Sequence, residues 1–171
     1  MVEERDMKKA YIRTFGCQMN VYDTGKMLAL LKNDGYEQTE LMEEADLVIV
    51  NTCSIREKPE LKLHSFLGEA RKIKRGRPNK DMTIAISGCV AQQEGKNLLN
   101  RYPDVNLVFG PDAVPNISTL LSATHNQKQV LDTTFLDEAD YVFASELDPN
   151  AKERVGAFVT IQKGCDNKCT F

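Results

Sequence analysis

The sequence has no apolar stretch that approaches the roughly 18 residues a membrane-spanning helix needs. It also has no internal repeat and no low-complexity tract. Its first nine residues are dense in charge. We therefore expect a cytoplasmic protein without membrane association.

The chain has little net charge. At −3 over 171 residues it generates no overall field that would hold a polyanion, so any RNA contact must be local or lie outside this chain. The basic residues gather at one place: Arg71, Lys72, Lys74, Arg75, Arg77 and Lys80. Basic residues suit a helix C-terminus, so this cluster predicts a solvated helix end, with a tRNA phosphate contact as the alternative.

Short apolar runs alternate with helical patterns along the chain. Strands are predicted at 10–14, 46–50, 82–86, 105–109 and 129–132. Apolar residues at helical spacing predict helices around 27–31, 63–73 and 114–121, the first ended by Gly35 and the second capped by Ser54. This βαβα order predicts an α/β fold, a doubly wound, flavodoxin-like parallel sheet flanked by helices, over residues 8–132.

The sequence changes character after this region. Residues 133–154 are acidic and irregular, which predicts a linker. A strand pattern resumes at 157–161 and leads directly into Cys165 and Cys169. We expect a second domain to begin at 155–171 and to be cut off there.

Five cysteines are poorly explained as disulfides, because their number is odd and the cytosol is reducing. Cys17, Cys53 and Cys89 are each 36 residues from the next. Each follows a predicted strand by one to three residues. The carboxyl ends of parallel strands lie along one edge of a doubly wound sheet, where such folds bind their ligands. The spacing therefore predicts that three thiols share one edge.

Several uses of these thiols remain open. A single cysteine is commonly a small buried hydrophobe, but three at the same structural position favour a shared metal or cluster. Zinc usually takes closely spaced cysteine pairs, whereas thiolates also hold iron–sulfur clusters, and three ligands on a four-iron cluster leave one iron open. Gly16 and Gly88, next to two of the cysteines, permit a tight turn and leave room for a bulky group.

The pattern Cys165-Asp-Asn-Lys-Cys169 resembles the Cys-x3-Cys-x2-Cys motif of radical S-adenosylmethionine enzymes, whose third cysteine would fall at position 172. The segments around all five cysteines resemble the methylthiotransferase family. They read Thr-Phe-Gly-Cys-Gln-Met-Asn at 14–20, Asn-Thr-Cys-Ser-Ile-Arg at 51–56, Gly-Cys-Val-Ala-Gln-Gln at 88–93 and Gln-Lys-Gly-Cys-Asp-Asn-Lys-Cys-Thr-Phe at 162–171. Gln18 and Met19 favour the branch that acts on isopentenyladenosine in tRNA over the branches that modify threonylcarbamoyladenosine in tRNA or a ribosomal protein.

The resemblance implies two 4Fe–4S clusters and S-adenosylmethionine as cofactors. Cys17, Cys53 and Cys89 would hold an auxiliary cluster in an N-terminal methylthiotransferase domain. Cys165 and Cys169, with the absent third cysteine, would hold the cluster that cleaves S-adenosylmethionine at the start of a radical-enzyme barrel. The implied reaction adds a methylthio group to C2 of isopentenyladenosine, and the chain alone should lack turnover.

The expected partners are the tRNA substrate, bound mainly outside this chain, and an electron donor such as flavodoxin or ferredoxin; the expected state is a monomer. Asn20, Asn51, Ser54 and Gln92 lie beside the cysteines, where they either donate hydrogen bonds to cluster sulfur or serve as turn and cap residues. We expect no function for His64 and His125, which have no ligand partner nearby. Two rival classes remain: a zinc-bound structural or regulatory domain, and a non-enzymatic module such as a flavin carrier or phospho-receiver.

Overall fold

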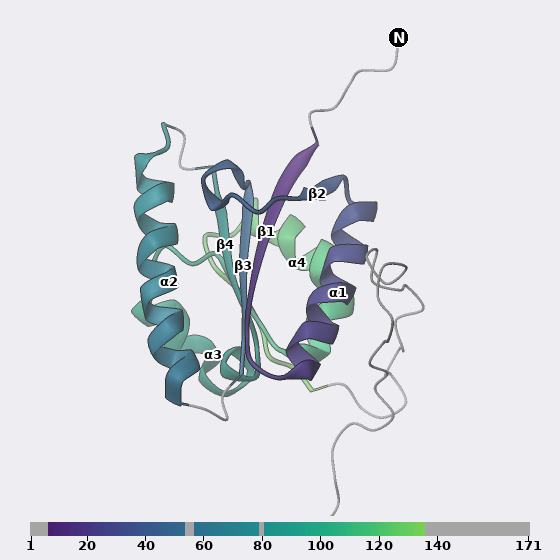
Figure 1. Cartoon of the computed structure of the whole chain (residues 1–171), viewed down its shortest axis with the longest axis vertical. Helices are drawn as coiled ribbons and strands as arrows, with labels where there is room; N and C mark the ends of the chain where they lie inside the picture. The colour runs from purple at the N-terminus through teal and green to yellow at the C-terminus, as the bar shows by residue number, and fades with distance from the viewer. Residues whose placement is uncertain (1–6, 54–56, 79–80, 136–171) are drawn as a thin grey trace, which may run out of the picture.

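The computed structural model describes residues 7–53, 57–78 and 81–135, and only the backbone of 57–61. These residues form a six-stranded parallel sheet with the strand order β2-β1-β3-β4-β5-β6 (Figure 1). Its strands are β1 (Lys8–Phe15), β2 (Tyr36–Gln38), β3 (Leu47–Thr52), β4 (Thr83–Gly88), β5 (Leu107–Phe109) and β6 (Val130–Asp132). The predicted doubly wound α/β fold is confirmed.

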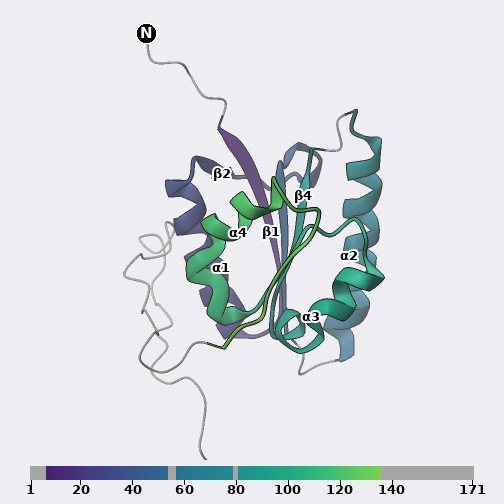
Figure 2. The ribbon, with the colours of Figure 1, turned by 180° about the vertical axis from the view of Figure 1, so that it is seen from behind.

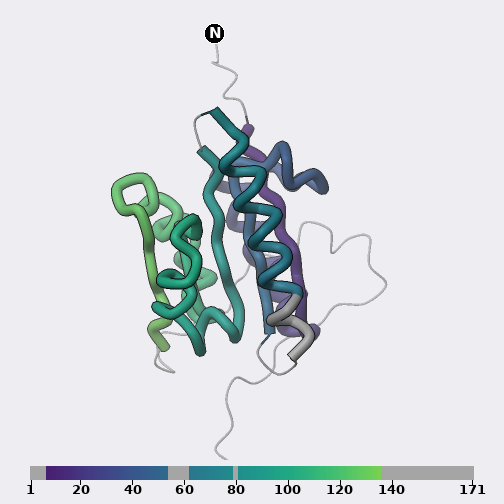
Figure 3. The backbone as a smooth tube through the Cα atoms, turned by 90° about the vertical axis from the view of Figure 1, so that its left-hand side faces the viewer, coloured from purple at the N-terminus to yellow at the C-terminus, as the bar shows by residue number. Residues whose placement is uncertain are grey.

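Helices cover both faces of the sheet. The helices are α1 (Gln18–Asn33), α2 (Glu57–Gly76), α3 (Cys89–Arg101) and α4 (Ile117–Thr124), with short 3-10 turns η1 (Met42–Glu44) and η2 (Pro111–Asn116). Helices α1 and α4 lie on one face, to the left of the strands in Figure 2. Helices α2 and α3 lie on the other face, which is seen in Figure 3.

The alternation of side chains along the central strand explains the two-sided core. All six residues of β3 are buried. Val48 and Val50 pack toward α2 and α3, whereas Leu47 and Ile49 pack toward α1 and α4. A strand buried on both faces reads as a continuous apolar run, which is why this strand was predictable from sequence.

All five predicted strands and all three predicted helices are present, but two elements were not predicted. Strand β2 has three residues, none of them buried, and lies at the sheet edge. Helix α3 is kinked at Gly95, where the backbone leaves helical geometry, and its buried apolar side chains come only in two separate pairs, Val90 with Ala91 and Leu98 with Leu99. Helix α1 ends as predicted, with Gly35 in the left-handed region at φ +82°.

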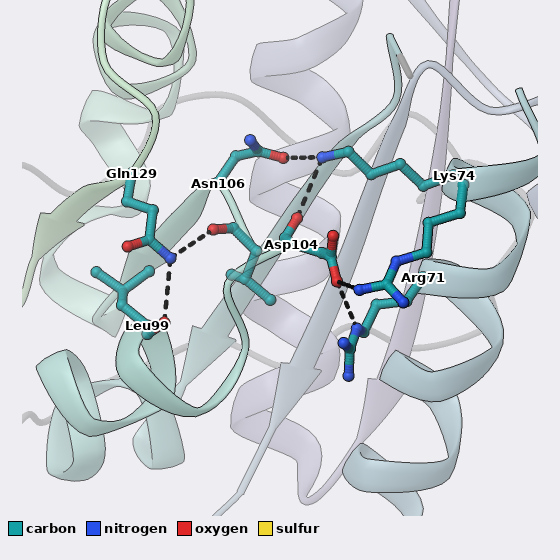
Figure 4. A network of polar contacts seen from close by, with 8 residues as sticks. Arg71, Lys74, Leu99, Asp104, Asn106 and Gln129 are labelled. Carbon is teal, nitrogen blue, oxygen red and sulfur yellow. Dashed lines mark hydrogen bonds and ion pairs between the residues drawn. The ribbon is translucent and has the colours of Figure 1, made fainter. Parts of the chain in front are cut away.

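The basic cluster at the end of α2 is solvated only in part: Lys72 and Arg75 are exposed as predicted, whereas Lys74 is buried and has a structural role (Figure 4). Arg71 and Arg75 donate to Asp104 Oδ2 at 2.6 and 2.8 Å. Lys74 is 9% exposed, and its Nζ donates to Asp104 O and Asn106 Oδ1. These contacts attach α2 to the segment that leads into β5.

Ser54 and Lys80 lie outside the described residues, as does the chain from 136 onward. The linker predicted at 133–154 and the second domain predicted at 155–171 therefore stay predictions. Among the helices of the described part, none is long and apolar enough to cross a membrane.

Candidate functional site

Strand register brings the three cysteine-containing turns to one edge of the sheet. Phe15 is paired with Thr52, and Thr52 with Gly88, so β1, β3 and β4 end side by side. Cys53 and Cys89 directly follow Thr52 and Gly88. Cys17 follows the end of β1 by two residues. Strand β1 ends toward the bottom of Figure 1, where α1 begins. The expected common edge is thus observed.

The turns that contain Cys17 and Cys53 are in close contact. The Cys53 N–H donates to Phe15 O at 3.0 Å. A Cβ atom placed on Gly16 would lie 2.9 Å from the Cys53 Cβ. Cys53 is 3% exposed, Cys89 is partly exposed and Cys17 is exposed. The turns of Cys17 and Cys53 therefore lie against each other, and Cys17 is the most exposed of the three cysteines.

The side chains do not yet form a metal site. Among the residues that the structure describes, no three Cys, His, Asp or Glu side chains are placed to hold a metal ion. The Cys17 thiol instead donates to Asn20 Oδ1 at 3.4 Å. Three thiols at the ends of adjacent strands are nevertheless the donor type that iron–sulfur clusters take. The donor chemistry and the strand register fit such a cluster, whereas the described side-chain positions do not form its site.

Three helices begin at this same edge. Cys17 is the N-cap of α1, Cys89 is the first residue of α3, and α2 begins at Glu57, four residues after Cys53. The N-terminus of a helix has a partial positive charge and unpaired N–H groups, both of which favour an anion. A cluster held by thiolates is anionic, so the backbone dipoles favour it at this position.

A buried pair of asparagines connects the turns. Asn20 Nδ2 donates to Asn51 Oδ1 at 2.9 Å, and Asn51 Nδ2 donates to Asn20 O at 2.8 Å and to Thr24 Oγ1 at 3.1 Å. Asn20 Oδ1 accepts the Cys17 N–H at 3.2 Å, which caps the start of α1. Of the two roles expected for these asparagines, the described bonds show the structural one.

Gly88 is required by this pair. Its φ of +93° is in the region that L side chains rarely adopt. A Cβ atom there would lie 2.6 Å from Asn51 Oδ1 and 3.0 Å from Asn20 Nδ2. The sequence suggested that the glycine leaves room for a prosthetic group, but the space beside Gly88 is occupied by the two amides.

The other candidates have structural contacts. Gln92 Nε2 donates to Thr133 O at 2.7 Å, which ties α3 to the residues after β6. The His64 ring packs 5.6 Å from the Tyr102 ring, and His125 Nδ1 lies 3.1 Å from Leu121 O. The expectation that neither histidine is a ligand stays a prediction. Cys165 and Cys169 lie outside the described residues.

Comparison with known proteins places these cysteines within a matched region. The family model described as "Uncharacterized protein family UPF0004" matches residues 9–110, which include Cys17, Cys53 and Cys89. A curated relative from Bartonella tribocorum (strain CIP 105476 / IBS 506), named tRNA-2-methylthio-N(6)-dimethylallyladenosine synthase, is 42% identical. The match covers 96% of this chain and 36% of the relative. The chain thus spans about a third of that relative's length.

Proposed function

The chain belongs to the UPF0004 family, the methylthiotransferase family that its motifs resemble, and we propose that it is the cluster-binding N-terminal part of a tRNA methylthiotransferase. The substrate we propose is isopentenyladenosine in tRNA, which receives a methylthio group at C2. The name of the 42% identical relative supports this substrate, as do Gln18 and Met19 after the first cysteine.

One observation carries the proposal: the register Phe15–Thr52–Gly88 sets three cysteines at one sheet edge. Cys17, Cys53 and Cys89 would hold an auxiliary 4Fe–4S cluster there. Cys165 and Cys169 would provide two ligands of a second 4Fe–4S cluster, with a third at position 172 of the longer protein. When bound, the two clusters and S-adenosylmethionine supply the radical and the sulfur that ordinary side chains cannot.

The described residues would position the auxiliary cluster rather than perform the reaction. The beginnings of α1, α2 and α3 present backbone N–H groups to an anionic group at the edge. Cys53, at 3% exposure, anchors the buried side, while the exposed Cys17 lies on the side open to a substrate. The remaining chain of the longer protein would bind the tRNA, and reduced flavodoxin or ferredoxin would supply electrons. The protein would act as a cytoplasmic monomer.

Anaerobic reconstitution with iron and sulfide tests the auxiliary site. In a chain carrying Cys165→Ala and Cys169→Ala, only the three edge cysteines remain. We expect about four irons and about four sulfides per chain, with the absorption of a 4Fe–4S cluster. Adding Cys17→Ala, Cys53→Ala or Cys89→Ala, one at a time, should abolish most of this uptake.

Metal analysis of the same samples separates the rival classes. Zinc in place of iron, at one atom per chain, would favour a structural or regulatory zinc domain. Bound flavin without iron would favour a flavin carrier. Iron uptake that is unchanged by all three added substitutions would sink the proposal.

A further inference from the structure

We infer that Asn20 and Asn51 are positioning residues that set the spacing of the three cysteine-containing turns, an inference that rests on the proposed cluster site. Both side chains are almost fully buried, at 2% and 0% exposure. Burying an amide costs free energy unless its hydrogen bonds are replaced. The two asparagines replace their hydrogen bonds to water mainly by bonds to each other, at the edge where the cysteines lie.

The pair contacts all three turns. The asparagine pair binds the Cys17 turn through Asn20 Oδ1, which accepts the Cys17 N–H. Asn51 itself lies two residues before Cys53, at the end of β3. The pair packs against the Cys89 turn at Gly88, where an added Cβ would collide with Asn51 Oδ1. One small polar unit therefore fixes three backbone segments that come from distant parts of the sequence.

Hydrogen-bond direction makes this unit specific. Asn51 uses its Oδ1 to accept from Asn20 and its Nδ2 to donate to Asn20 O and Thr24 Oγ1. Reversing the Asn51 amide would bring its oxygen against Asn20 O, so the observed orientation is the one that satisfies the neighbours. Fully satisfied buried networks of this kind hold one geometry rather than several. An apolar pair of similar size would fill the space without holding the Cys17 turn.

Asn20→Asp separates positioning from simple helix capping. The aspartate retains an oxygen that accepts the Cys17 N–H, and a carboxylate is favourable in the first turn of a helix. It removes the donor to Asn51 Oδ1 and sets two oxygens against each other. If Asn20 were only a cap, this substitution would leave the cysteine edge unchanged.

Asn51→Leu removes the hydrogen bonds that the β3 member of the pair makes to α1. Asn106→Leu is the matched control, because Asn106 also joins separate elements: its Oδ1 accepts from Lys74 Nζ at 2.6 Å and from Ile84 N at 3.1 Å. Asn106 directly precedes β5, so it lies where the strands begin, whereas the cysteines lie where the strands end. The control therefore disturbs a partly buried polar junction without touching the cysteine turns.

The first measurement is the rate at which an iron chelator removes the reconstituted cluster. We expect loss to be about 10- to 100-fold faster in Asn20→Asp and Asn51→Leu, the range typical for residues that orient metal ligands. The Asn106→Leu control should stay within about twofold of the unsubstituted chain. Equal rates in Asn51→Leu and the control, or an unchanged rate in Asn20→Asp, would overturn the inference.

The second measurement needs no cluster. Amide hydrogen exchange of the metal-free chain should be faster at Cys17 in Asn51→Leu and unchanged there in Asn106→Leu. If the unsubstituted chain takes up no iron, the proposed function fails and this exchange alone decides the inference. Unaltered exchange at Cys17 in Asn51→Leu would then reject it.

Discussion

At Gly88 the backbone has a φ of +93° and a ψ of −165°, and the next residue is Cys89. This region of conformational space is essentially restricted to glycine, and the strain of placing another residue there is about 1–3 kcal/mol. A methyl group would also collide with Thr52 O and Asn51 Oδ1. Conformation and space thus both exclude a side chain at this position.

We predict that Gly88→Ala lowers the free energy of unfolding by about 1–3 kcal/mol or more. Urea denaturation followed by circular dichroism measures this value. Gly68→Ala is the control, because Gly68 lies on the exposed side of α2 with nothing within 4 Å of an added Cβ. That change should stabilise the helix by about 0.5–1 kcal/mol. Equal stabilities for the two variants would contradict the argument.

The placement of the cysteines after strands was predictable from the sequence. The two asparagines could be identified as neighbours of cysteines, but the hydrogen bond between them could not be predicted. Cys17, Cys53 and Cys89 each follow an apolar run, and the sequence alone fixes that relation. Asn20 and Asn51 were recognised as neighbours of cysteines. Their hydrogen bond joins residues 31 positions apart, so it depends on how α1 packs against β3 and has no local sequence signal.

Helix α2 is attached to the segment before β5 by ion pairs that surround Asp104 (Figure 4). Burial acts to raise the pKa of Asp104, but hydrogen bonds from Arg71 and Arg75 outweigh it and hold the pKa below its usual 3.8. A carboxyl with a lowered folded-state pKa adds stability above its unfolded-state pKa, and that stability is lost as the pH falls through the folded-state pKa. The attachment of α2 should therefore weaken in acid.

We predict that Asp104→Asn lowers the free energy of unfolding by about 1 kcal/mol at neutral pH. The difference from the unsubstituted chain should shrink as the pH falls below about 3.8, where Asp104 itself becomes protonated. Thermal unfolding across a pH series measures both effects. The control is Asp81→Asn, in which a carboxylate that is 59% exposed loses a 3.6 Å ion pair with Arg77. The free energy of unfolding should fall less in this control than in Asp104→Asn. A pH-independent difference for Asp104→Asn would contradict the prediction.

Hydrophobic periodicity identified the elements that pack by a regular apolar face. It found β3 and β4, whose residues are almost all buried, and β1, of which only Ala10 is buried. It also found α2 from Leu63, Phe66, Leu67 and Ala70. It missed α3, whose buried apolar residues are only two pairs separated by six residues, and it missed β2, which has three residues and none buried. Both missed elements are stabilised by the sheet beside them rather than by their own sequence.

At the scale of the whole molecule, the core of the described residues is built around one sheet. Both apolar clusters draw on residues from Ala10 to Val130. The last strand, β6, completes the sheet through Val130 N–H to Asn106 O and Gly110 N–H to Asp132 O, both at 2.8 Å. The residues after β6 contribute a bond from Gln92 to Thr133 O. A chain that ends at Phe135 thus retains every one of these contacts.

We predict that a chain ending at residue 135 unfolds in a single transition, with a midpoint within a few degrees of the 171-residue chain. Calorimetry measures the transition, and reconstitution of both chains, the longer one carrying Cys165→Ala and Cys169→Ala, compares their iron uptake. A chain ending at residue 128 is the control, because it loses β6 and leaves backbone groups of β5 unpaired. That chain should be strongly destabilised. If the chain ending at 135 also fails to fold, the domain extends beyond the sheet, and the cysteine edge depends on residues that follow it.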